Sequence, residues 1–207
     1  MAINSQLWAS STSKIFTGVL IGLACAILTG IAAYITTPLT TAYYAVIVIG
    51  ALGGLFALFM QASGAGQLSQ AVEDADAPAV KGVQSAFKMM IIAAIISLIS
   101  SLLIFAFSSD LNSFLVSILC SVVLAIAAGV FSLIGAIKAM GAFSKLKVSE
   151  TFPAKDAASK LWIAYLLYVI AAGCTISIVL SAVGAICSIV AYVFAFIGWM
   201  GLKNTKA

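Results

Sequence analysis

Six long apolar stretches fill most of this chain and constrain its fold more than any other feature. Each has about 17 to 25 residues, enough for a helix rising ~1.5 Å per residue to cross a ~30 Å hydrocarbon core. The stretches cover approximately residues 15–36, 39–60, 87–107, 113–137, 161–180 and 184–200. The chain is 64% hydrophobic and only 8% charged, whereas soluble domains are about 25% charged. The sequence therefore predicts an all-α integral membrane protein, with residues 1–207 forming one membrane domain of six transmembrane helices.

Polar segments of two different lengths separate the apolar stretches. Short turns near Pro38, Asp110 and Gly184 join the first stretch to the second, the third to the fourth, and the fifth to the sixth. Longer polar connectors cover about 61–84 and 144–158. Because short loops join antiparallel neighbours, we expect three consecutive helical hairpins.

Each connector contains a predicted helix start. Asp76 and Thr151 are suitable N-cap residues, and each is followed two positions later by a proline, Pro78 and Pro153. Apolar residues at helical spacing in the first connector indicate two helical extensions that meet at an acidic bend. Trp8 precedes the first apolar stretch, where a tryptophan suits the headgroup interface.

Short motifs recur along the chain at similar intervals. Ser13, Ser85 and Ser159 each precede an apolar stretch and are spaced by 72 and 74 residues, and the dipeptide at 140–141 recurs at 200–201. Such spacing favours an internal repeat, in which one helical hairpin has been triplicated.

Lysine placement predicts the orientation in the membrane. All ten basic residues are lysines, and they fall in the N-terminus, in the two connectors with their flanking turns, or in the C-terminus. The three short turns contain no lysine. The positive-inside rule then places both termini and both connectors in the cytoplasm. A bacterial inner (plasma) membrane suits the compact spans and the lack of a targeting signal, although a eukaryotic organelle stays open.

The composition argues against most catalytic and cofactor chemistry. The chain has no histidine or arginine, so it lacks an imidazole base, a histidine zinc site and a guanidinium fork for phosphate. Its four cysteines lie in apolar stretches and suit packing, and its net charge of +4 suits orientation rather than nucleic-acid binding. A serine–lysine dyad would need Lys138, but Ser132 and Ser144 are each six residues away and off its helical face. A serine from another helix stays open.

Two groups of residues are candidate contact sites. The first comprises small residues that let helices approach closely, either within this bundle or against another chain. These are Gly18 and Gly22, Gly50 and Gly54, and Gly184 and Ser188. The second comprises lysines expected to reach lipid headgroups. These are Lys138, Lys145, Lys147 and Lys203.

These patterns lead to two functional hypotheses. The first is a non-catalytic membrane subunit or accessory scaffold, without cofactor or metal, whose partners are the lipid bilayer and another membrane protein or further copies of itself. The alternative is an oligomeric channel or facilitator for a small neutral solute, with hydroxyls such as Ser100 and Ser177 along the path.

Overall fold

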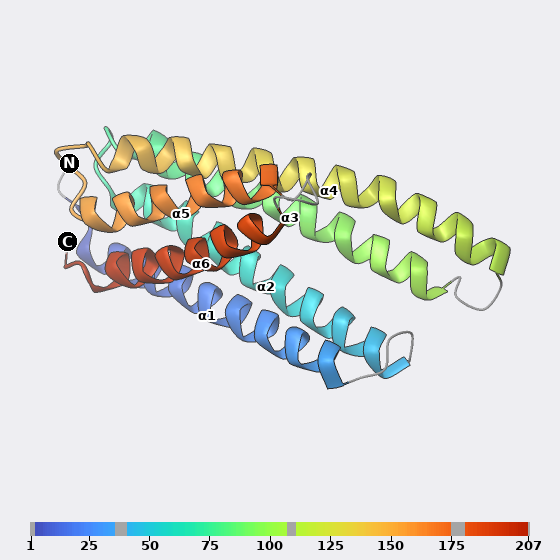
Figure 1. Cartoon of the computed structure of the whole chain (residues 1–207). Helices are drawn as coiled ribbons and strands as arrows, with labels where there is room; N and C mark the ends of the chain where they lie inside the picture. The colour runs from blue at the N-terminus through green and yellow to red at the C-terminus, as the bar shows by residue number, and fades with distance from the viewer. Residues whose placement is uncertain (1–2, 36–40, 107–110, 175–180, 207) are drawn as a thin grey trace.

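The computed structural model describes residues 3–35, 41–106, 111–174 and 181–206. Within these residues the chain forms six α-helices and no strand (Figure 1). The helices are α1 (Ser5–Ile35), α2 (Thr41–Ala71), α3 (Ala77–Ala106), α4 (Leu111–Leu146), α5 (Lys155–Cys174) and α6 (Ser181–Asn204). All six are long and apolar enough to cross a membrane. The predicted all-helical class and the predicted number of apolar helices are therefore confirmed.

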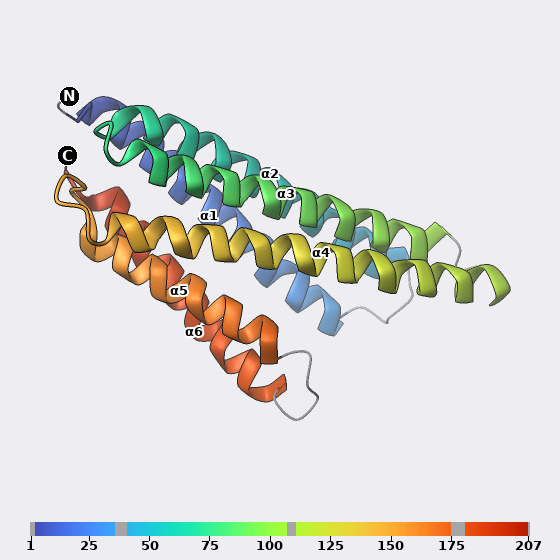
Figure 2. The same cartoon turned by 90° about the horizontal axis from the view of Figure 1, so that it is seen from above.

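The helices close into a ring at one end of the molecule. Helix α1 packs against α2, α3 against α4, and α5 against α6, while α2–α3, α4–α5 and α6–α1 contacts join these pairs. Both termini and both connectors lie together at one end, which we call the closed end (Figure 1). Toward the opposite, open end the pairs diverge: Figure 1 shows α1–α2 separating from α3–α4, and Figure 2 shows α5–α6 separating from α3–α4.

Most helices extend beyond the apolar stretches toward the closed end. Helix α1 begins at Ser5, where the side-chain oxygen of Asn4 accepts a hydrogen bond from the Leu7 amide at 3.1 Å. Helix α2 continues to Ala71 and α3 starts at Ala77. The first connector is thus two helical extensions joined by a short bend, as its apolar spacing predicts.

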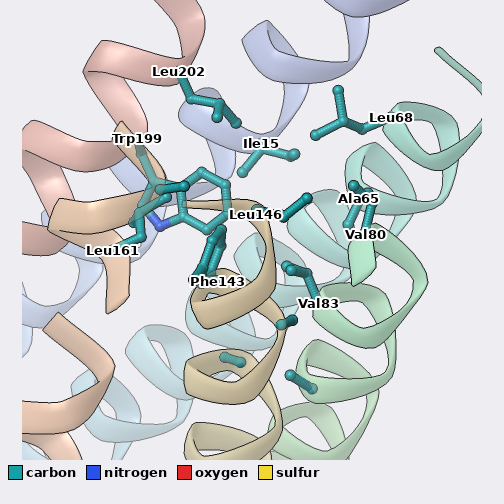
Figure 3. Packing of buried hydrophobic residues seen from close by; sticks show 14 of the residues in the cluster. Ile15, Ala65, Leu68, Val80, Val83, Phe143, Leu146, Leu161, Trp199 and Leu202 are labelled. Carbon is teal, nitrogen blue, oxygen red and sulfur yellow. The ribbon is translucent and has the colours of Figure 1, made fainter. Parts of the chain in front are cut away.

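The apolar core lies at the closed end, and all six helices contribute to it. Its large side chains fill the centre of the ring (Figure 3). They include Trp8, Ile15, Leu68, Val80, Phe87, Phe143, Leu146, Leu161, Trp199 and Leu202. The Trp199 ring lies 5.6 Å from Phe143 and 5.9 Å from Phe87, measured between ring centroids. The space left at this centre is a cavity of about 10 Å³, about the room that one water molecule needs.

The Trp8 side chain is buried inside the protein, whereas its place ahead of the first apolar stretch predicts a ring exposed to lipid headgroups. Its side chain is only 1% exposed, and its ring packs 5.6 Å from that of Phe152 in the second connector. The indole Nε1–H donates a hydrogen bond to the Thr205 carbonyl oxygen at 3.0 Å. Burial is favoured because the amphipathic indole ring is surrounded by apolar side chains and its N–H finds a hydrogen-bond acceptor at the same place.

Thr151 is not the N-cap of α5, so that prediction is wrong. Helix α5 begins at Lys155, and the amide of Ala158 bonds to the carbonyl of Ala154. The second connector instead folds back and buries Phe152, which is 1% exposed. This leaves the Thr151 hydroxyl free to donate a hydrogen bond to Asp76 Oδ2 at 2.7 Å.

Apolar side chains cover the outside of the diverging halves. Ile27 and Leu28 of α1, Ile49 of α2 and Leu119 of α4 are between 52% and 69% exposed. A large apolar surface of this kind suits hydrocarbon rather than water.

Candidate functional site

The glycine pairs predicted as packing faces lie partly in the contact between α1 and α2. A Cβ atom on Gly18 would lie 2.7 Å from the Ala57 carbonyl oxygen and 2.9 Å from Gln61 Cγ. A Cβ atom on Gly50 would collide with the Thr29 side chain. Glycine at both positions therefore allows the two helices to approach closely, as small residues do between membrane helices.

The second members of these pairs behave differently. Gly22 has room for a Cβ atom, which would lie 3.5 Å from Ala57 Cβ. Gly54 has no heavy atom of the neighbouring helices within 4 Å of that position. Two further glycines in the diverging halves, Gly30 of α1 and Gly129 of α4, also face open space. The spacing alone could not distinguish glycines that pack within the chain from those that do not.

The third predicted face belongs to α6. Gly184 is buried, and the Ser188 hydroxyl is half-buried and donates a hydrogen bond to the Gly184 carbonyl at 3.0 Å. This bond lies within the helix itself, so Ser188 does not use its hydroxyl to hold a second helix.

The structure also identifies packing glycines that sequence reasoning missed. A Cβ atom on Gly64 or on Gly198 would lie 2.6 Å from Ile15 Cγ1 or from Leu161 Cγ, respectively. One on Gly135 would lie 2.9 Å from Met90 Cγ. None of these three glycines belongs to a G-x-x-x-G pair, so that motif could not have found them.

The four predicted headgroup lysines fall into two kinds of environment. Lys147 Nζ lies 3.4 Å from the centroid of the Trp162 ring, and Lys203 Nζ lies 4.9 Å from that of Phe16. Both are cation–π contacts with aromatic faces. Lys138 and Lys145 are exposed on α4, and Lys138 Nζ donates a hydrogen bond to a hydroxyl, Ser85 Oγ of α3, at 3.2 Å.

The contact between Lys138 and Ser85 tests the remaining serine–lysine possibility. A lysine that serves as a base must lose its proton, which requires desolvation or nearby cations. Lys138 is exposed. A similar pair joins Lys14 of α1 to Ser63 of α2 at 2.8 Å, also at an exposed position. Two such pairs between neighbouring helices favour a structural role for the contact.

The serines considered as lining for a solute path bind neighbouring backbone instead. Ser100 Oγ donates to the Ser121 carbonyl at 3.3 Å, and Ser121 Oγ donates to the Ser100 carbonyl at 3.2 Å. Both side chains are buried. This reciprocal pair links α3 to α4 inside the membrane-spanning part. Ser177 lies outside the described residues, as do Pro38 and Asp110 of the predicted turns.

Hydrogen bonds join the termini and the connectors at the closed end. The Asn4 amide donates to the Ala71 carbonyl at 3.0 Å, which holds the start of α1 to the end of α2. Asp76 is 3% exposed and accepts the bond from Thr151, whose hydroxyl also lies 3.1 Å from that of Ser149. The two connectors are therefore linked through a buried carboxylate.

The described residues hold no group of three or more Cys, Asp or Glu side chains that could bind a metal ion. The four cysteines are free thiols. Comparison with protein-family models, with curated proteins and with solved structures found no match. The architecture itself defines the class: six long apolar helices are consistent with a multi-pass integral membrane protein.

Proposed function

We propose that this chain is a non-catalytic subunit or accessory scaffold that binds other membrane proteins. The observation that carries the proposal is a group of glycines in the diverging halves that meet no neighbouring helix among the described residues, among them Gly30, Gly54 and Gly129. Glycine lowers helix stability by about 1 kcal/mol relative to alanine. Between membrane helices it is useful where another backbone must come close. A partner helix is the contact that these positions suit.

The placement of the chemistry-bearing side chains supports a non-catalytic role. The Ser100 and Ser121 hydroxyls bind backbone carbonyls, and the exposed Lys138 ammonium binds a serine hydroxyl. Large apolar side chains fill the ring at the closed end. None of these arrangements favours a solute path through one protomer.

We further propose that the chain lies in a bacterial inner membrane as three repeated hairpins, with both termini cytoplasmic. Pairwise packing of α1 with α2, α3 with α4 and α5 with α6 supports the hairpins. The ten lysines, all placed toward the end that holds the termini and the connectors, support the orientation.

The test is native mass spectrometry of the tagged chain, extracted gently from its own membrane. We expect the mass spectrum to show a second membrane protein bound at fixed stoichiometry. In the Gly54→Leu variant the partner should be lost while the chain stays folded, because the added side chain occupies open space. Ala24→Leu, at an exposed alanine of α1, is the matched control and should keep the partner. A chain that runs alone, or only with copies of itself, would contradict the proposal.

A further inference from the structure

One exposed stripe of α3 changes its chemistry abruptly along the helix. Toward the open end it presents Ile99, Ile95 and Ile92, which are 38% to 46% exposed. The same stripe continues toward the closed end with Lys88, Ser85 and Lys81, of which both lysines are exposed. Alternating steps of three and four residues keep all six positions on one face. The stripe therefore passes from a surface suited to hydrocarbon to one suited to headgroups.

The adjacent stripe of α4 makes the same change at the same level. Ile134 is 38% exposed, and the exposed residues Lys138, Gly141 and Lys145 follow it at helical spacing. The hydrogen bond from Lys138 Nζ to Ser85 Oγ joins the two stripes side by side. Gly141 has open space where a side chain would begin, so the surface between the two lysines of α4 is accessible.

The resulting surface is cationic and has no acidic neighbour on its own helices. We call it the α3–α4 lysine patch, and it consists of Lys81, Ser85, Lys88, Lys138 and Lys145. Neither α3 nor α4 contains an acidic residue. The nearby Asp76 is buried beneath the second connector and bound to Thr151. The positive charge of the patch therefore faces outward.

We infer that the α3–α4 lysine patch is a binding site for the phosphate-bearing headgroup of an anionic phospholipid. A lipid whose chains lie along Ile92, Ile95 and Ile99 brings its phosphate to the level of Lys88 and Lys138. Lysine binds phosphate as a compact charge, and the Ser85 hydroxyl adds a hydrogen-bonding group. The continuous apolar stripe leading into the patch favours a lipid over a soluble anion. This site is independent of any protein partner.

The experiment titrates the purified full-length chain with phosphatidylglycerol or phosphatidylcholine of the same chain length and measures bound lipid by native mass spectrometry. The parent should prefer phosphatidylglycerol. Each lysine near a membrane surface strengthens anionic binding about fivefold, so Lys88→Gln with Lys138→Gln should weaken it about 25-fold. Lys88→Arg with Lys138→Arg should keep most of the affinity, because the charge remains.

The control variant carries Lys155→Gln with Lys206→Gln, two exposed lysines outside the patch. It has the same loss of charge and should bind phosphatidylglycerol within about twofold of the parent. Equal losses in both double variants, or no loss in the patch variant, would overturn the inference. Should the first variant fold poorly, Lys81→Gln with Lys145→Gln removes two exposed lysines and should weaken binding to a similar extent. Retention of a protein partner is a separate readout and is not expected to change.

Discussion

At the scale of single residues, glycines with the same sequence signature differ in what surrounds them. Gly18→Ala would place a Cβ atom 2.7 Å from the Ala57 carbonyl oxygen, and overpacking of this kind costs about 1–3 kcal/mol. Gly54→Ala meets open space and should be neutral or stabilise the helix by up to about 1 kcal/mol. Reversible unfolding in mixed micelles with increasing dodecyl sulfate measures the free energy of unfolding of both variants. Equal stabilities would contradict the α1–α2 contact described above.

The buried Asp76 carboxylate is a second residue with a measurable role. Hydrogen bonds to charged groups contribute about 1.5–3 kcal/mol, so Thr151→Val should destabilise the chain by that amount. Asp76→Ala should cost at least as much, because it also removes the carboxylate from the position just before α3, where a side-chain oxygen can cap the helix. A double-mutant cycle then gives a coupling free energy of about 1–2 kcal/mol. Asp74→Ala, at an exposed neighbour, is the control and should change stability by less than about 0.5 kcal/mol.

At the scale of elements, the first turns of α1 act as part of the core rather than as a polar leader to the first span. Trp8→Ala should cost about 3–5 kcal/mol, since it empties a buried aromatic site. Trp8→Phe keeps most of the ring and loses the bond to Thr205, which should cost about 1 kcal/mol. Micelle unfolding distinguishes the two variants. A tryptophan that only anchored the chain at the headgroups would show a small effect in both.

Apolar periodicity predicted the elements well but not their packing. Long apolar stretches identify helices because few other structures satisfy the backbone in lipid. Such helices are apolar on every side, however, so the sequence does not distinguish a core face from a lipid face. Phe143 is 2% exposed and Ile137 is 46% exposed, although both are large apolar residues of α4.

The candidate sites depended in the same way on distant contacts. The sequence predicts that Lys138 contacts headgroups but does not indicate its partner Ser85, which lies 53 positions away. The lysine patch needs the register of α3 against α4, which no local pattern specifies. The sequence suggests Ser100 as a pore residue because it carries a hydroxyl within an apolar stretch. Its actual partner, Ser121, lies on the next helix.

At the scale of the whole molecule, the orientation can be tested directly. With the four native cysteines replaced by alanine, Val148→Cys places a thiol at a position that is 71% exposed in the second connector. A membrane-impermeant maleimide should label it in inverted vesicles and not in intact cells. Labelling in intact cells would instead place the second connector outside the cytoplasm and contradict the proposed orientation. Cysteines introduced by Ile27→Cys or Leu119→Cys, at positions that suit hydrocarbon, should remain unlabelled in both preparations.

The contact between Trp8 and Thr205 also has a consequence for biosynthesis. The two residues are 197 positions apart, so the indole lacks this hydrogen-bond partner until Thr205, just after α6, has been synthesised. Helices α1 to α5 are therefore synthesised before this contact at the closed end can form. The closed end is therefore completed only late in synthesis, and a chain that stops before Thr205 leaves Trp8 without this hydrogen bond.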